Sequence, residues 1–117
     1  MNPYVLVATG GSLGAVSRYI VSDKFTSPYG TTAVNTAGSF ALGFLISKSL
    51  QGGLVGEKLA LLLGVGFLGA FTTLSTFSIE LLEILKEGKM EDALGYFMSN
   101  AIGGPLMAYL GFIMGGK

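Results

Sequence analysis

Long stretches without any charged residue are the feature that most constrains what this chain can fold into. Four such windows are 17, 23, 21 and 24 residues long. They run over Met1–Ser17, Phe25–Ser47, Leu59–Ile79 and Ala93–Gly116. A helix needs about 20 mostly apolar residues to cross the hydrocarbon core of a bilayer, so the windows predict an all-α membrane protein with four transmembrane helices. The predicted spans cover approximately 2–22, 28–49, 58–85 and 93–115, in a single domain over residues 1–117.

The composition argues against most other classes of protein. Only 12% of the residues are charged, against about a quarter in a typical soluble domain. The net charge is zero, so nothing electrostatic favours nucleic acid as a partner. The chain has no Cys, His or Trp, which removes disulfides, the usual zinc and haem ligands and the usual proton-shuttling side chain. No nucleophile–base pair is visible either, and we therefore expect no enzyme activity.

The basic residues divide almost evenly between the two sides of the predicted membrane. The side of the N-terminus would hold three of them, Lys48, Lys58 and Lys117. The opposite side would hold four, Arg18, Lys24, Lys86 and Lys89. The positive-inside rule needs a bias in order to choose an orientation. Two readings remain open: one weakly favoured orientation, or insertion in both orientations followed by assembly as an antiparallel pair.

The third predicted span is unusually rich in hydroxyl groups. Three glycines are followed by five hydroxyl-bearing residues within seven positions, namely Thr72, Thr73, Ser75, Thr76 and Ser78. One such residue can bond back to its own helix, but five together favour an interruption of the helix near residues 69–76. Interrupted backbone at membrane depth occurs where it is buried in protein or lines a cavity.

Polar residues also lie at the centre of the second and fourth predicted spans. Asn35 is followed one turn later by Ser39, and Tyr96 and Asn100 lie one turn apart. Pro105 should bend the fourth helix. These polar side chains either join helices to one another or line a polar path through the bundle.

Three further residues each have two interpretations. Glu80 lies about one turn beyond Thr76, either at the membrane interface or partly buried. Arg18 either extends to the headgroups and anchors the first span or attracts anions into a vestibule. Phe77 is either an ordinary packing residue or a ring whose electropositive edge contacts an anion.

Small residues recur at helical spacing on several predicted spans. The pairs and triplets are Gly10/Gly14, Ser39/Gly43, Ala60/Gly64, Gly95/Ser99/Gly103 and Gly111/Gly115. Such stripes allow close approach of helices within one chain or between two chains. Four spans cannot easily bury all of them, and this surplus favours an oligomer.

Three stretches of the sequence carry distinctive motifs, namely GGSLGAVSRY (Gly10–Tyr19), YGTTAVNTAGSFALGF (Tyr29–Phe44) and GAFTTLSTFSIE (Gly69–Glu80). They resemble the signature motifs of the Fluc/CrcB fluoride channel family. The resemblance implies a passive, fluoride-selective channel of the cell membrane that exports fluoride from the cytoplasm and lowers its toxicity. It also implies an antiparallel, dual-topology homodimer with two fluoride pores and a central structural sodium ion.

The same resemblance implies roles for individual residues. The fluoride pore would be formed by Asn35, Phe77, Ser75, Thr76, Leu74, Tyr96, Asn100, Glu80 and Thr31, with Arg18 in the vestibule. The sodium ion would bind the backbone carbonyls of Gly69 and Thr72, two from each subunit.

Two positions depart from the family pattern. The family's TTFSTF is TTLSTF here, so Leu74 replaces the first pore phenylalanine, and Gly104 stands where the family often has a hydroxyl. Leucine has no electropositive ring edge. We therefore expect a working channel with altered throughput.

Two other kinds of membrane protein have a similar size. A small proton-coupled multidrug transporter depends on a glutamate in its first span, and Met1–Ser17 contains no acid. A non-transporting accessory subunit would need fewer hydroxyls than the third span contains. A fluoride pore, in contrast, must replace tightly held water with hydrogen-bond donors and still release the ion, which fits the absence of lysine from the central part of every span.

Overall fold

A computed structural model describes residues 2–52 and 56–117, and the residues described form helices and connections without a strand. The first half contains α1 (Pro3–Lys24) and α2 (Tyr29–Leu50). A composite rod follows, made of α3 (Glu57–Leu59), η1 (Ala60–Leu68), α4 (Gly69–Phe71) and α5 (Ser75–Lys86). The chain ends with α6 (Met90–Ala101) and α7 (Gly103–Gly115).

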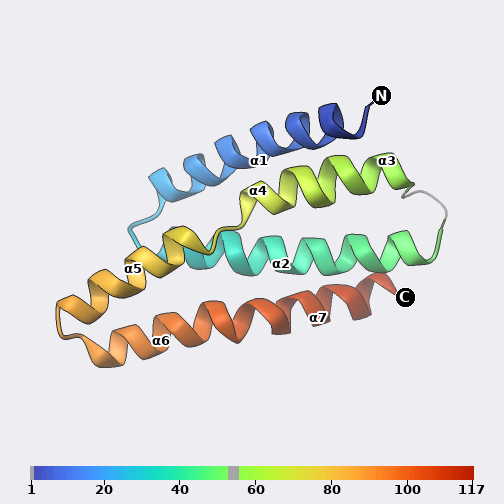
Figure 1. Ribbon diagram of the computed structural model, residues 1–117. Helices are drawn as coiled ribbons and strands as arrows, with labels where there is room; N and C mark the ends of the chain where they lie inside the picture. The colour runs from blue at the N-terminus through green and yellow to red at the C-terminus, as the bar shows by residue number, and fades with distance from the viewer. Residues whose placement is uncertain (1, 53–55) are drawn as a thin grey trace.

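The elements form four elongated rods that run up and down along one axis (Figure 1). The two termini lie at one end of the bundle, and the α1–α2 and α5–α6 connections lie at the other. The bundle measures 50 × 30 × 20 Å. Its long axis therefore exceeds the roughly 30 Å thickness of a bilayer's hydrocarbon core.

Local sequence signals set several helix ends. Asn2 accepts a hydrogen bond from the Tyr4 amide at 2.7 Å, and Pro3 occupies the first turn of α1, where a missing N–H costs nothing. Gly88 follows α5 with φ of 77°, a left-handed conformation that glycine adopts without strain. Its amide bonds to the Leu85 carbonyl at 3.0 Å and so closes the last turn of α5.

Three rods in the described part of the chain are long and apolar enough to cross a membrane. They are Pro3–Lys24, Glu57–Lys86 and Met90–Gly115. α2 has the same 22-residue length as α1 but does not belong to this set, because it carries several polar residues. These are Thr31, Thr32, Asn35, Thr36 and Ser39. The protein is thus a multi-pass membrane protein.

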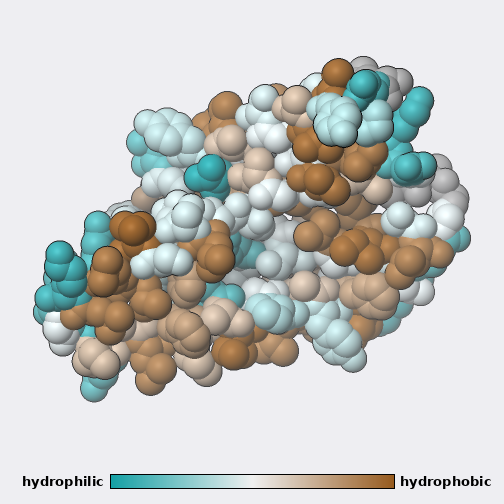
Figure 2. All heavy atoms as spheres, in the orientation of Figure 1, coloured by the Kyte–Doolittle hydropathy of each residue, from teal (hydrophilic) through white to brown (hydrophobic). Residues whose placement is uncertain are grey.

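The distribution of apolar side chains supports this conclusion. Large hydrophobic residues such as Leu13, Val16 and Ile20 are exposed along the outside of the bundle. Figure 2 shows hydrophobic residues over much of one face, with hydrophilic residues gathered mainly towards the two ends of the long axis. A water-soluble protein buries such side chains, whereas lipid solvates them.

Glycine sets the distance between the helices of two packed pairs. A Cβ at Gly43 would lie 2.0 Å from the Ala108 carbonyl oxygen of α7, and one at Gly111 would lie 2.0 Å from that of Phe40. A Cβ at Gly10 would lie 2.0 Å from the Leu62 carbonyl oxygen. These stripes are therefore used within the chain. Gly95, in contrast, has nothing within 4 Å of its Cβ position.

The third rod is interrupted within the predicted region. α4 ends at Phe71, α5 begins at Ser75, and Thr72 has an extended backbone with φ of −88° and ψ of 156°. η1 is a π-helix, a rare and wider form that is common near functional sites. The fourth rod is irregular at Ile102, where Pro105 has no N–H to donate to the Ala101 carbonyl.

Candidate functional site

The side chain of Asn35 on α2 fills the break in the third rod. Its Oδ1 accepts a hydrogen bond from the Thr73 amide at 2.8 Å, and its Nδ2 donates to the Thr73 carbonyl at 3.0 Å. The carboxamide thus takes both backbone groups of one residue in the break. At membrane depth these groups have no water to bond with, so Asn35 makes the interrupted backbone tolerable.

Asn100 on α6 extends this arrangement. Asn35 Nδ2 donates its second hydrogen bond to Asn100 Oδ1 at 2.8 Å. Asn100 Nδ2 in turn donates to Thr32 Oγ1 at 3.0 Å and to the Tyr96 carbonyl at 3.1 Å. Asn100 is buried. We call the connected set of Asn35, Asn100, Thr32 and Thr73 the polar layer.

Glu80 on α5 lies at the centre of a second network, nearer the α5–α6 end. The Tyr96 hydroxyl donates to Glu80 Oε1 at 2.9 Å, and Thr31 Oγ1 donates to the same oxygen. Ser27 Oγ donates to Oε2. Glu80 is therefore partly buried, and its carboxylate joins the α1–α2 connection, α2 and α6 to α5.

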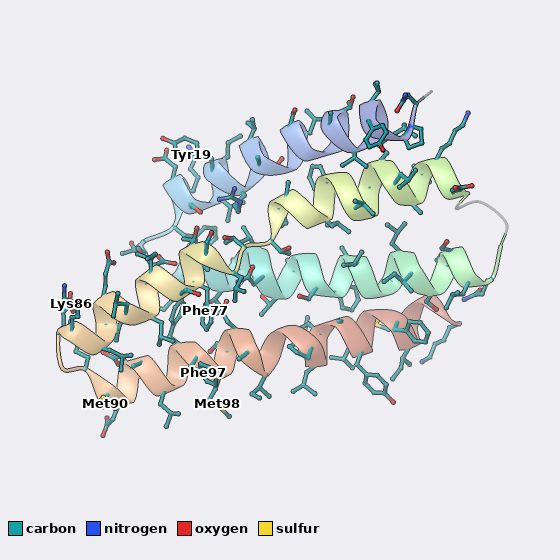
Figure 3. All side chains as sticks on the ribbon, in the orientation of Figure 1. Tyr19, Phe77, Lys86, Met90, Phe97 and Met98 are labelled. Carbon is teal, nitrogen blue, oxygen red and sulfur yellow. The ribbon has the colours of Figure 1, made fainter. Side chains whose placement is uncertain are left out.

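Phe77 packs between α5 and α6 (Figure 3). Its ring is 8% exposed and lies 5.3 Å, centroid to centroid, from the ring of Tyr96. Phe97 is the second aromatic neighbour, at 6.3 Å. Leu74, in contrast, is 75% exposed at the break. The ring of Phe77 is thus held in place, while position 74 has few contacts within the chain.

The hydroxyls that follow the break have different surroundings. The Thr76 amide donates to Thr73 Oγ1 at 3.2 Å, which closes the first turn of α5. Ser75 is exposed and its Oγ lies 3.4 Å from Thr73 Oγ1. Thr31 is only 3% exposed. Ser75 and Thr76 therefore lie at the break, while Thr31 belongs to the Glu80 network.

Two cavities lie on either side of the polar layer. The outer cavity, of about 600 Å³, lies towards the α5–α6 end and is lined by residues that include Thr32, Tyr96 and Glu80. The inner cavity, of about 510 Å³, is lined by Asn35, Ser39, Gly69, Thr72, Thr73, Leu74, Phe77, Asn100, Ala101, Gly104, Pro105 and Ala108. Thr32 lines the outer cavity and Asn100 lines the inner cavity, so the hydrogen bond between them connects the walls of the two cavities.

The outer cavity is strongly acidic at its mouth. Glu83, Glu87, Glu91 and Asp92 line it together with Glu80, and Lys89 is the one basic residue among the described residues of its lining. Lys89 Nζ lies 3.1 Å from the Glu87 carboxylate, with both side chains well exposed. This mouth therefore carries a surplus of negative charge.

Two backbone carbonyls at the break lose the donors that a continuous helix would supply. The Thr73 amide bonds to Asn35 instead of to the Gly69 carbonyl four residues earlier. The Thr76 amide bonds to Thr73 Oγ1 instead of to the Thr72 carbonyl. Uncharged carbonyl oxygens of this kind are suitable ligands for an alkali cation. Among the described residues, no group of three or more His, Cys, Asp and Glu could hold a metal ion.

Arg18 on α1 contacts the third rod next to the break. Its Nε donates to the Ala70 carbonyl at 2.9 Å, close to the end of α4. This hydrogen bond directs the Arg18 side chain towards the third rod. The guanidinium satisfies a carbonyl at the C-terminal end of a helix, where a positive charge is favoured.

Three residues of these networks have no individual role predicted from the sequence. Thr32 precedes Asn35 by three residues on α2 and follows the same face, so helical spacing could have identified it. Thr73 was one of five hydroxyls, and nothing in the sequence singles out its backbone. Ser27 lies in a connection, and only the tertiary structure brings it to Glu80.

Comparison with known proteins supports a single family. Residues 5–112 match the family described as CrcB-like protein, Camphor Resistance (CrcB). A protein of Dehalococcoides mccartyi named "Fluoride-specific ion channel FluC" is 42% identical over 98% of this chain and 93% of its own length. A protein of the same name from Magnetococcus marinus is 43% identical over 93% of this chain and 94% of its own length. Another from Thermus thermophilus is 41% identical over 99% of this chain and 97% of its own length.

These similarities extend over almost the whole chain and confirm the resemblance seen in its three motifs. The matched stretch, residues 5–112, contains the polar layer and the Glu80 network. The chain therefore belongs to the CrcB family.

Proposed function

We propose that this protein is a passive, fluoride-selective channel that exports fluoride from the cytoplasm and so lowers fluoride toxicity. The relatives' names support the choice of ion. The observation that carries the proposal is the polar layer, a hydrogen-bonded constriction between two cavities in a bundle whose outside is apolar. An ion moving between the cavities would exchange water for amide and hydroxyl groups at this layer.

The chemistry of the proposed path suits a small, strongly hydrated anion. Asn35, Asn100, Ser75, Thr76 and Tyr96 carry neutral donors that can replace water around an anion. Asn35, Asn100 and Tyr96 would exchange a hydrogen bond within the chain for one to the anion. Thr31, Glu80, Phe77 and Leu74 would complete the path, and the buried edge of the Phe77 ring would add a weakly electropositive contact. Neutral donors permit release of the ion, which conduction requires.

The membrane potential would supply the driving force. An inside-negative potential is worth about 2.3 kcal/mol per elementary charge for each 100 mV. At about 1.4 kcal/mol per tenfold change in an equilibrium constant, this supports a fluoride ratio on the order of 50 across the membrane. Export therefore needs neither ATP nor a coupled ion.

We also propose that α2 crosses the membrane with the other three rods. α2 lies against α6 and α7 along most of its length, from the Asn35–Asn100 hydrogen bond to the Gln51 Nε2–Gly115 carbonyl hydrogen bond of 2.8 Å. A partner packed so closely to a spanning helix must cross at the same depth. Its polar residues face this protein interior rather than lipid.

An antiparallel, dual-topology homodimer with two pores completes the proposal. The even division of basic residues supports insertion in both orientations. An apolar groove of about 440 Å³ lies between α2 and η1, lined by Phe40, Ala41, Phe44, Leu45, Leu63, Phe67 and Leu68. A second copy is the partner we assign to this face.

A structural sodium ion fits the residues at the break. Gly69 is exposed in the single chain, and its carbonyl and that of Thr72 lack their helical donors. Two copies meeting there would provide four neutral oxygens. When bound, the ion would interact with these carbonyl oxygens in place of the missing amide donors and would link the two subunits. Asn35 would keep the helix interrupted, so that the carbonyls stay available.

Fluoride efflux from liposomes tests the proposed function. Purified protein in vesicles loaded with potassium fluoride should release fluoride rapidly after valinomycin is added, as measured with a fluoride electrode. Matched vesicles loaded with chloride should release little. Comparable chloride release, or no release of either ion from a folded dimer in sodium, would contradict the proposal.

The dimer and the sodium ion require separate measurements. A C-terminal tag that is accessible from both sides of sealed vesicles would support dual topology, and access from one side alone would contradict it. Replacing sodium with N-methylglucamine should lower the fraction of dimer in detergent. An unchanged dimer fraction would argue against the sodium site and leave the fluoride result untouched.

A further inference from the structure

Four serine hydroxyls within these helices make no hydrogen bond to a residue that the structure describes, those of Ser17, Ser22, Ser39 and Ser49, and of these four Ser39 lines the inner cavity. Six other Ser and Thr hydroxyls donate to the carbonyl four residues earlier, namely those of Thr9, Ser12, Thr36, Thr72, Ser78 and Ser99. Such a bond is the usual solution for a hydroxyl on a membrane helix. Ser39 Oγ makes no hydrogen bond to any residue that the structure describes, although Ser39 lines the inner cavity.

The other polar side chains of the inner cavity already use their donors. Both hydrogens of Asn35 Nδ2 are taken, by the Thr73 carbonyl and by Asn100 Oδ1. Both hydrogens of Asn100 Nδ2 go to Thr32 and Tyr96.

The two threonines of this cavity are occupied as well. Thr72 Oγ1 donates to the Leu68 carbonyl, and Thr73 Oγ1 donates to Thr76 Oγ1. Among the residues lining this cavity, all of which the structure describes, Ser39 is the side chain whose donor remains free.

The opposite wall leaves room in front of this hydroxyl. Gly104 on α7 is buried and lines the same cavity. A Cβ built on Gly104 would lie 3.6 Å from Ser39 Oγ, an ordinary van der Waals distance, with no other described atom of a neighbouring helix within 4 Å. Glycine at this position therefore keeps a space next to Ser39 that a small ion or a water molecule can enter.

We propose that Ser39 donates a hydrogen bond directly to the anion in the inner cavity, before the ion reaches Asn35 and Asn100. The inference rests on the proposed channel function and adds a residue to its binding path. An anion can be bound there without breaking any hydrogen bond of the polar layer, because Ser39 has a donor to give. The chemical class of ligand is a small, hard anion with room for one close hydroxyl contact.

The test measures the initial rate of efflux from liposomes against the internal fluoride concentration. Loss of one hydrogen bond to an anion should raise the concentration that gives half-maximal flux about tenfold in Ser39→Ala. Ser12→Ala is the matched control, since its hydroxyl is occupied by the Ala8 carbonyl on the exposed side of α1. This control should leave the half-maximal concentration unchanged.

A relocated hydroxyl distinguishes direct binding from packing. Adding Gly104→Ser to Ser39→Ala returns a hydroxyl to the same cavity from the opposite wall, and should lower the half-maximal concentration towards the wild-type value. Adding Gly104→Ala supplies the same carbon without the oxygen and should not. The inference would be overturned if adding Gly104→Ala restored the half-maximal concentration, or if Ser39→Ala left that concentration unchanged. Absence of fluoride efflux from the wild-type protein would instead overturn the proposed function, and this inference with it.

Discussion

The carboxamide of Asn35 pairs with both the amide and the carbonyl of Thr73, 38 residues later in the chain. This pair lets the third rod be interrupted without leaving these two backbone groups unpaired in the membrane. It also fixes the direction of Asn35, so that its remaining hydrogen reaches Asn100. The site and the break are therefore a single structural feature.

Asn35→Ala should destabilise the fold and abolish fluoride efflux. It leaves the Thr73 amide and carbonyl without partners, and each unsatisfied group costs about 1–3 kcal/mol. We expect a lower midpoint of thermal unfolding in detergent. Thr9→Ala, which removes only a back-bonded hydroxyl, should change the midpoint little. Equal midpoints for the two variants would contradict the role of Asn35 at the break.

Tyr96→Phe and Glu80→Gln should be energetically coupled. The 2.9 Å bond between the Tyr96 hydroxyl and Glu80 is charge-assisted when the carboxylate is ionised. Contacting residues in one network show coupling of about 0.5–3 kcal/mol. A double-mutant cycle on the free energy of unfolding should find coupling in this range. As a control, the effects of Tyr96→Phe and of Glu57→Gln, at the far end of the bundle, should be additive. If the effects of Tyr96→Phe and Glu80→Gln on the free energy of unfolding were additive, the hydrogen-bond network around Glu80 would be contradicted.

Leu74→Phe should raise fluoride flux without altering stability. Leu74 is 75% exposed in the single chain, so a larger ring meets little packing resistance there and the stability change should stay within about 0.5 kcal/mol. An added ring edge gives the anion another electropositive contact. Leu74→Met is the control for size without aromaticity. If flux were unchanged in Leu74→Phe, this position would be unimportant for permeation.

Removing negative charge from the mouth of the outer cavity should speed fluoride entry at low ionic strength. Glu83 and Glu91 line this mouth with other carboxylates, and a surface of one sign lowers the local concentration of ions of the same sign. Glu83→Gln with Glu91→Gln should therefore raise efflux at about 10 mM salt, where the Debye length is about 30 Å, and much less at about 1 M, where it is about 3 Å.

The control for this experiment lies at the opposite end of the bundle. Glu57 begins α3, near the termini and far from the outer cavity. Glu57→Gln should not reproduce the salt-dependent gain. An equal gain in both variants would show that total charge, rather than the acidic mouth, controls entry.

Gly43→Ala should weaken the contact between α2 and α7. Its Cβ would lie 2.0 Å from the Ala108 carbonyl oxygen, a backbone atom that cannot rotate away. Overpacking of this kind costs about 1–3 kcal/mol or more. Gly95→Ala enters open space and should instead gain about 0.5–1 kcal/mol from reduced backbone entropy. The two thermal midpoints in detergent should move in opposite directions.

The sequence by itself determined the membrane fold class and the position of the break. Charge-free windows of about the thickness of a bilayer leave little alternative to spanning helices. Hydroxyls and glycines concentrated in one span weaken a continuous helix locally. Both signals depend on neighbouring residues, and local patterns of this kind are readable without a structure.

Only the tertiary structure decided which polar groups meet. Ser27 and Glu80 are 53 residues apart, and Asn35 and Asn100 are 65 apart. The pairing of Asn35 with Asn100 depends on the close approach of α2 to the fourth rod, which Gly43 and Gly111 permit at the contact of α2 with α7. Arg18 likewise turned inwards to the Ala70 carbonyl because α1 packs beside η1 and α4.

The physical reason for this division is that unsatisfied hydrogen-bonding groups are costly in a membrane. The sequence reveals that Asn35, Asn100 and Glu80 need partners. It does not reveal which partners, since any donor or acceptor at the same depth would serve. Helix packing makes that choice, and it left Ser39 facing a cavity with its donor free.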